Sequence, residues 1–211
     1  SGLIDFSAGQ LNGVSIGNET IVSKYFNSVD MDRYKGGIHL QGEYRFNGAE
    51  LLVDDIVSPN IGALRLYLAP ISWFSDTEWS DRLQLCFLSG IDFRSPLRAY
   101  DNGIHTFFTG GGEIDLRLIE RERLLLGNYF VTAAMNGDIG LHLGMTLNWS
   151  ILSSDKLGLF LKGEYRYSGP KYFPALFNPF YDYNRFHFTK TDSPPNATFA
   201  DHAVFGSGES F

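Results

Sequence analysis

The chain has one cysteine, no long apolar run and no excess of basic residues, and these absences narrow its class. Cys86 cannot form an internal disulfide and offers no cysteine cluster for a metal. No run of about 18 apolar residues occurs, which excludes a helical membrane span. The formal net charge of −7 argues against nucleic acid as a partner, because phosphate binding needs a basic surface.

Aromatic residues and glycine are abundant instead. Aromatic residues make up 15% of the chain, with 18 Phe and 11 Tyr, and there are 23 glycines. Charged residues, at 19%, fall below the usual share of about 25%. The mean hydropathy of −0.11 is close to zero. Moderate hydropathy spread over many strands is typical of a membrane β-barrel.

The clearest pattern runs from Gly137 to Tyr167, where two stretches of about 11 residues alternate apolar with polar or small side chains. The residues of the predominantly apolar face are Ile139, Leu141, Leu143, Met145, Leu147, Trp149, Leu157, Leu159, Leu161, Gly163, Tyr165 and Tyr167. Residues 153–155, Ser-Ser-Asp, are predicted to form the turn of an antiparallel hairpin. Strands of this length exceed the usual soluble strand of about 5 to 6 residues and match the 9 to 11 or so that cross a membrane.

The same alternation predicts strands at 36–46, 49–57, 61–69, 82–93, 112–119 and 124–134, and a less regular strand at 3–8. Asn47-Gly48 is predicted to be the first tight turn. Residues 9–32 are interpreted as a long loop or an inward-folded segment, and 94–110 as a loop. Short and long connections tend to alternate, which is typical of a barrel with short turns on one side of a membrane.

These patterns predict a single all-β domain, an antiparallel up-and-down transmembrane β-barrel. Residues 1–35 form its N-terminal strand and loop, 36–168 its strand-rich barrel region, and 169–211 a long aromatic and proline-rich loop or extension. Eight or nine strands are counted. Because single-chain bacterial barrels usually have an even number, we interpret the strands as part of a larger barrel.

Alternation also predicts which charged side chains face a lumen. The predicted lumen-lining residues are Glu43, Arg45, Arg65, Asp92, Glu113, Asp115, Arg117, His142, Lys162, Glu164 and Arg166. Five of them are acidic and five are basic, so we expect paired charges that brace a narrow barrel or line a weakly selective channel.

Catalytic and metal-binding motifs are weak in this sequence. No G-x-S-x-G motif accompanies the five histidines. Asp30 with Asp32, and Asp54 with Asp55, lack the spacing of a calcium-binding loop. No catalytic residue, metal or cofactor is predicted, and we expect the protein not to be an enzyme.

The stretch YKGGIHLQGEYRFNGAELLVDDIVSPNIGALRLYLAP, with the later GGGEIDLRL and KYFPALFNPFY, resembles porin-like outer-membrane barrel proteins of diderm bacteria, a poorly characterised family. The resemblance covers most of residues 36–182 and lies in strand pattern and turn positions. It implies the bacterial outer membrane as the location, with a channel or structural role. The partners it implies are outer-membrane lipid and small solutes.

A soluble lipocalin-like barrel or sandwich that holds an apolar ligand is the alternative. The two hypotheses place the apolar face of the strands on opposite sides of the barrel. In the soluble protein Leu141, Leu143, Leu159 and Leu161 point inward, whereas in the membrane protein they contact lipid.

Overall fold

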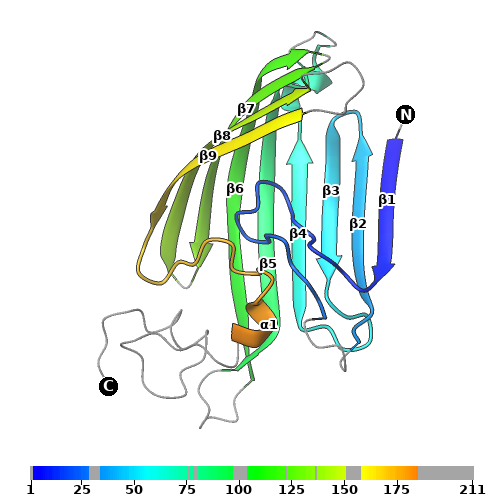
Figure 1. Cartoon of the computed structure of the whole chain (residues 1–211), viewed down its shortest axis with the longest axis vertical. Coiled ribbons are helices and arrows are strands. Elements are labelled where there is room, and N and C mark those ends of the chain that lie inside the picture. Colours follow the sequence, from blue (N-terminus) through cyan, green and yellow to red (C-terminus); the bar gives the residue numbers. More distant parts are fainter. Residues whose placement is uncertain are drawn as a thin grey trace.

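The protein folds into one antiparallel β-sheet, seen in a computed structural model that describes residues 2–28, 34–75, 77, 80–96, 104–121, 123–135, 137–150 and 158–184. The strands are β1 (Gly2–Gly9), β2 (Gly37–Tyr44), β3 (Asn47–Val53), β4 (Ile61–Leu68), β5 (Leu83–Pro96), β6 (Ile104–Arg121), β7 (Leu124–Met135), β8 (Asp138–Ser150) and β9 (Gly158–Ser168). Each strand pairs with the next along the chain, in the order β1 to β9 (Figure 1). A 3₁₀ turn, η1 (Pro70–Trp73), and a single helical turn, α1 (Tyr181–Asn184), complete the described elements.

The all-β, up-and-down antiparallel architecture predicted from the sequence is confirmed. The sheet curves but does not close, and among the described residues β1 and β9 each have one strand neighbour. No helix among those residues has the length and apolar composition that crossing a membrane requires.

Several predicted boundaries are wrong. The turn between β2 and β3 lies at Arg45 and Phe46, which have φ of 47° and 65°. Gly48 is already in β3, where a side chain would meet the carbonyl oxygen of Gly42 and the ring of Tyr67. The two positive φ angles that an Asn-Gly turn usually supplies are therefore found two residues earlier. The side chain of Asn47 supports this turn by donating to the carbonyl oxygen of Arg45 at 2.7 Å.

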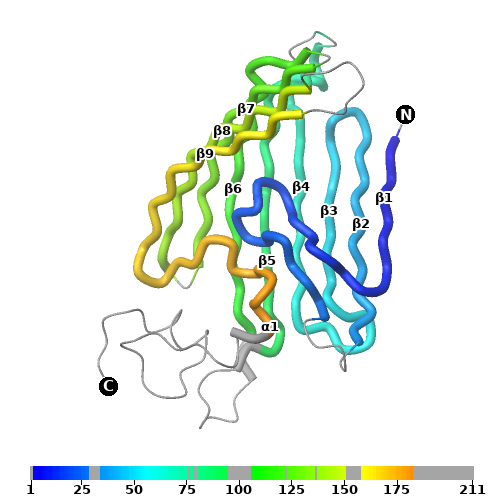
Figure 2. The backbone as a smooth tube through the Cα atoms, viewed as in Figure 1, coloured from blue at the N-terminus to red at the C-terminus, as the bar shows by residue number. Residues whose placement is uncertain are grey.

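The predicted loop at 94–110 is also shorter than expected, because β5 continues to Pro96 and β6 begins at Ile104. Short and long connections do not segregate to opposite ends of the sheet. The end with the two-residue turn at 45–46 also carries the long connection 69–82, and the other end carries both 10–36 and the two-residue connection 136–137 (Figure 2). The predicted turn at 153–155 and residues 185–211 lie outside the described residues.

Residues 9–32 were open to two interpretations, and their described part folds inward. Residues 10–27 leave β1 and lie across one face of the sheet together with residues 169–184, which follow β9 (Figure 1). We call these two stretches the inner segments, and the face that they cover the inner face. They join each other by backbone hydrogen bonds, including Ser23 N to Phe177 O at 2.9 Å and Phe177 N to Ile21 O at 3.0 Å.

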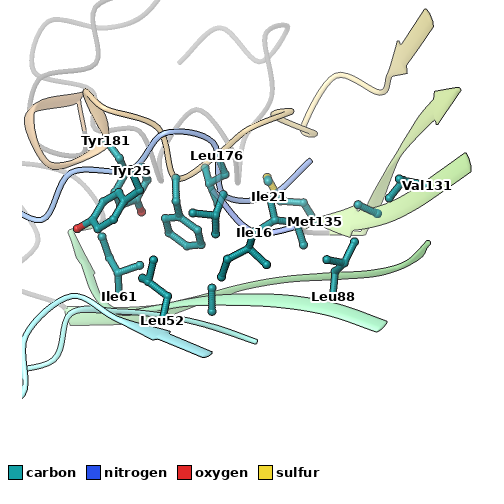
Figure 3. Close-up of a cluster of buried hydrophobic side chains, with 14 of the residues drawn as sticks. Ile16, Ile21, Tyr25, Leu52, Ile61, Leu88, Val131, Met135, Leu176 and Tyr181 are labelled. Carbon is teal, nitrogen blue, oxygen red and sulfur yellow. The ribbon is translucent and has the colours of Figure 1, made fainter. Parts of the chain in front are cut away.

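The hydrophobic core lies between the inner segments and the sheet. Figure 3 shows Ile16, Ile21 and Leu176 from the inner segments above Leu52 and Leu88 from the strands. Each of these five side chains is almost completely buried. The core thus lies between the sheet and segments of its own chain.

The outer face is the opposite surface of the same strands, and its large apolar side chains are exposed. On β5 to β9 the outer-face residues include Leu85, Phe87, Phe93, Phe108, Ile114, Leu116, Phe130, Ile139, Leu141, Leu143, Met145, Leu159 and Leu161. Leu143 is 58% exposed, and its neighbour His142 is completely buried on the inner face. Period-two alternation therefore separates an apolar outer surface from a partly polar interior.

Candidate functional site: the polar inner face

Polar side chains on the inner face gather in three groups between the strands and the inner segments. Register places cross-strand partners on one face, so Glu113 on β6, Val131 on β7 and His142 on β8 lie in one inner row. Nearly all of the predicted lumen-lining residues lie within strands. Arg45 does not, since it lies in the β2–β3 turn with its guanidinium 5.7 Å from the ring centre of Tyr44.

Arg65 on β4 is the centre of the first group. Its Nη2 lies 2.7 Å from Glu113 Oε1 and 3.0 Å from Asp115 Oδ2, and 3.3 Å from Cys86 Sγ. From the inner segments, Asn18 Nδ2 donates to Asp115 Oδ1 at 2.6 Å. The Glu113 side chain is fully buried, and that of Arg65 is 11% exposed. The guanidinium thus neutralises carboxylates that could not remain charged alone in this environment.

Cys86, Glu113 and Asp115 bring three atoms capable of binding a metal within 4.8 Å of one another. The guanidinium of Arg65 contacts all three residues. Because Arg65 already supplies the positive charge that the carboxylates need, we interpret this group as an ion-pair cluster that joins β4, β5 and β6.

His142 on β8 is the centre of the second group. Its Nδ1 lies 2.6 Å from Glu164 Oε1, and its Nε2 lies 2.8 Å from the hydroxyl of Tyr172 in the inner segments. A carboxylate only accepts hydrogen bonds, so Nδ1 carries a proton, and in the neutral imidazole Nε2 then accepts from the Tyr172 hydroxyl. Burial raises the pKa of Tyr172 above its ordinary value, which keeps the hydroxyl protonated and able to donate. Arg166 completes the chain by donating to Glu164 Oε2 at 2.8 Å.

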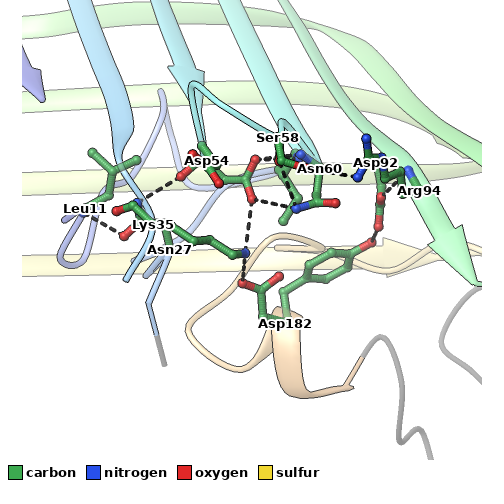
Figure 4. A network of polar contacts seen from close by, with 12 residues as sticks. Leu11, Asn27, Lys35, Asp54, Ser58, Asn60, Asp92, Arg94 and Asp182 are labelled. Carbon is green, nitrogen blue, oxygen red and sulfur yellow. Dashed lines mark hydrogen bonds and ion pairs between the residues drawn. The ribbon is translucent and has the colours of Figure 1, made fainter. Parts of the chain in front are cut away.

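Lys35 holds the third group, at the end of the sheet where β3 leads into β4 (Figure 4). Its ammonium lies 3.1 Å from Asp54 Oδ2 and 2.6 Å from Asp182 Oδ2. Burial lowers the pKa of Lys35, but the charges and hydrogen bonds of Asp182 and Asp54 more than offset it, so the pKa is raised above the ordinary 10.5. Asp54 also accepts from the backbone N–H groups of Asn60 and Ile61.

The remaining predicted residues have separate contacts. Asp92 on β5 accepts from the hydroxyl of Tyr181 at 2.7 Å, and Lys162 on β9 lies 3.4 Å from Glu19 Oε2 in the inner segments. Glu43 accepts from the Tyr67 hydroxyl at 3.1 Å. Arg117 lies 3.5 Å from Glu120 in a more exposed ion pair. The eleven predicted residues therefore do not form one ring but separate contacts along the sheet.

The sequence analysis did not identify the residues outside the strands that complete these groups. They include Asn18, Asn27 and Tyr172 in the inner segments, and Lys35 just before β2 at the end of the sheet. Asn27 is fully buried and donates to the carbonyl oxygens of Gly9, Lys35 and Asp54. No alternation marks these positions because they lie outside strands. A polar residue in an irregular stretch reveals its partner only after the chain has folded.

Known proteins give no guide to this site. The chain matches no family model, no curated protein and no solved structure.

Proposed function

We propose that the chain forms the wall of a porin-like β-barrel in a bacterial outer membrane, with its outer face in contact with lipid. The observation that supports this proposal most strongly is that apolar side chains are exposed on the outer face, whereas charged and polar side chains are buried on the inner face. Leu143 and Leu161 on the outer face are more than half exposed, while Glu113, His142 and Asp92 on the inner face are buried. A soluble protein places its charged side chains in water, so this arrangement supports lipid as the outer solvent.

The lengths of the strands support the same proposal. The part of the β8 outer row that lies beside β9 runs from Leu141 to Trp149, which is about 27 Å of extended chain. A strand tilted by about 40° then spans roughly 20 Å of the membrane, close to the apolar band of about 25 Å in known barrels. Register places Tyr167 beside Leu141 at one end of this row and Leu159 beside Trp149 at the other. Aromatic side chains at opposite ends of the hairpin suit two membrane interfaces.

The two hypotheses make opposite predictions for four leucines, Leu141, Leu143, Leu159 and Leu161. All four lie on the outer face and are exposed. This favours the membrane barrel over a soluble barrel with an internal apolar ligand. The inner segments lie where a wide channel would run, so we propose a narrowed path for small solutes. A structural role is the second candidate, favoured by the packed core on the inner face. We propose no enzymatic activity.

Gel mobility and bilayer conductance test this proposal together. We expect protein folded in detergent to migrate differently before and after boiling, to aggregate without detergent, and to insert into lipid vesicles. Monodisperse folded protein in plain buffer would contradict the membrane location. For protein that does insert, small conductance steps would support the narrowed channel, and a silent bilayer would support the structural role.

A further inference from the structure

The two edge strands of the sheet are incomplete as a membrane structure. β1 pairs only with β2, and β9 only with β8, within the described part of the chain. A bilayer offers no water to the backbone groups of an open edge, so both edges need strand partners. Resting on the function proposed above, we propose that a second copy of this chain supplies them, with β9 of each copy pairing with β1 of the other in an eighteen-stranded barrel.

Closure of one nine-stranded sheet on itself conflicts with the content of its inner face. A barrel of about eight strands has an interior just wide enough for side chains, and a ninth strand widens it little. Here the inner face holds two backbone segments, 10–27 and 169–184, with large buried side chains such as Tyr25 and Phe177. Two sheets enclose a much wider space, because barrel diameter grows with strand number.

Strand direction is compatible with a two-fold axis along the barrel. Nine strands that alternate in direction leave β1 and β9 running the same way, and both begin at the end of the sheet drawn at the top of Figure 1. A rotation about the barrel axis keeps that direction for both copies and brings β9 of one beside β1 of the other. The two seams are therefore parallel ladders, and they are identical, as cyclic symmetry requires.

The facing edges are complementary on the inner face when Leu3 lies beside Phe160 of the other copy. Leu3 is 73% exposed and Phe160 is 63% exposed, although both belong to inner-facing rows. Two residues further along, the same register places Asp5 beside Lys162, which are of opposite charge. Each seam thus covers an apolar pair and then matches an acid with a base.

The outer face alternates large with small side chains in this register. Phe6 lies beside Gly163, and Ala8 lies beside Tyr165. A side chain added at Gly163 would meet nothing within 4 Å, so there is open space for the Phe6 ring. Two residues before Phe6, in the same register, Ile4 lies beside Leu161 and forms an apolar pair. The outer surface would continue across the seam without a gap.

Cysteine cross-linking of the chain in lipid vesicles tests this proposal. With Cys86→Ser as the background, we would make Ile4→Cys and Leu161→Cys as separate single variants and as a double variant, and treat each with a short bis-methanethiosulfonate. We expect a covalent dimer from the double variant and from a mixture of the two single variants, but none from either single variant alone. The mixture links only when the two residues come from different copies.

Two further variants make the result specific. The pair Ile4→Cys with Tyr167→Cys, six residues out of register, is expected not to link, and the pair Phe6→Cys with Gly163→Cys repeats the test should the first pair fold poorly. Linkage within one chain would overturn the proposal in favour of a self-closed sheet. Absence of linkage in vesicle-inserted protein would overturn it while leaving the membrane barrel in place. Failure of the unmodified chain to enter vesicles would overturn both.

Discussion

At the scale of single residues, ion pairs on the inner face join side chains from distant parts of the chain. Arg65 joins Glu113 and Asp115 across three strands, and Lys35 joins Asp54 to Asp182 at the rim. The sequence predicted that Arg65, Glu113 and Asp115 share a face, because period-two alternation fixes the direction of each side chain. It could not predict Lys35 or Asp182, whose positions depend on how irregular segments fold.

Replacing Arg65 by methionine should lower the free energy of unfolding by about 3–5 kcal/mol, because the buried Glu113 and the partly buried Asp115 then lack their cation. Urea unfolding in detergent micelles measures this. Arg117→Met is the matched control, since its ion pair with Glu120 is more exposed and should contribute only about 0–1 kcal/mol. Equal effects of the two substitutions would contradict a buried cluster.

Lys35 should make stability depend on alkaline pH. A lysine whose pKa is raised by folding contributes stability that is complete below its unfolded pKa of about 10.5 and is lost as the pH rises through its folded pKa. We expect the unfolding free energy of the native chain to fall more steeply above about pH 10 than that of Lys35→Met. Lys24→Met removes the same charge from an exposed position and should keep the native pH profile. A Lys35→Met profile parallel to the native one would contradict the role of this ion pair.

At the scale of elements, alternation predicted the existence and faces of the strands better than their ends. Apolar and polar residues alternate strongly in β8 and β9, and both strands lie close to the predicted ranges. The first turn was misplaced because Asn47-Gly48 has the composition of a tight turn, while tertiary contacts place Gly48 against Tyr67. The inner segments have no periodic pattern, so their packing could not be derived from the sequence.

Gly48→Ala should destabilise the sheet by about 1–3 kcal/mol, because the new methyl group meets the Gly42 carbonyl oxygen and the Tyr67 ring. Thermal unfolding in micelles gives the difference. Gly42→Ala on β2 is the control, since its methyl group meets nothing within 4 Å and alanine suits a strand better than glycine. A neutral Gly48→Ala would contradict the close approach of Gly48 to the Gly42 carbonyl oxygen and the Tyr67 ring.

At the scale of the whole molecule, the sheet is covered on its inner face by its own chain, whereas its outer face is apolar and exposed. This arrangement explains why alternation alone left two hypotheses open. A strand in a soluble sandwich and a strand in a membrane barrel have the same period, and they differ in the solvent that the apolar face meets. The burial of His142 and Glu113 opposite an exposed Leu143 is the observation on which the proposed lipid-facing outer surface rests.

Leu143→Arg should lower stability in lipid by about 2–4 kcal/mol if this position lies near the membrane midplane. Leu159→Arg makes the same exchange near the end of β9 and should cost only about 0–1 kcal/mol. Unfolding of both variants from lipid vesicles gives the two values. In a protein with a water-exposed outer face, both substitutions would lie within about 0.5 kcal/mol of zero.

The contact between the outer face and lipid can be measured directly by fluorescence quenching. With Cys86→Ser as the background, a small fluorophore is attached to Leu143→Cys on the outer face or to Thr146→Cys on the inner face, and each protein is placed in vesicles with brominated lipid chains. We predict strong quenching at position 143 and little at position 146, because only the outer face meets the acyl chains. Equal, weak quenching at both positions, or failure of the protein to associate with the vesicles, would contradict a lipid-facing outer surface.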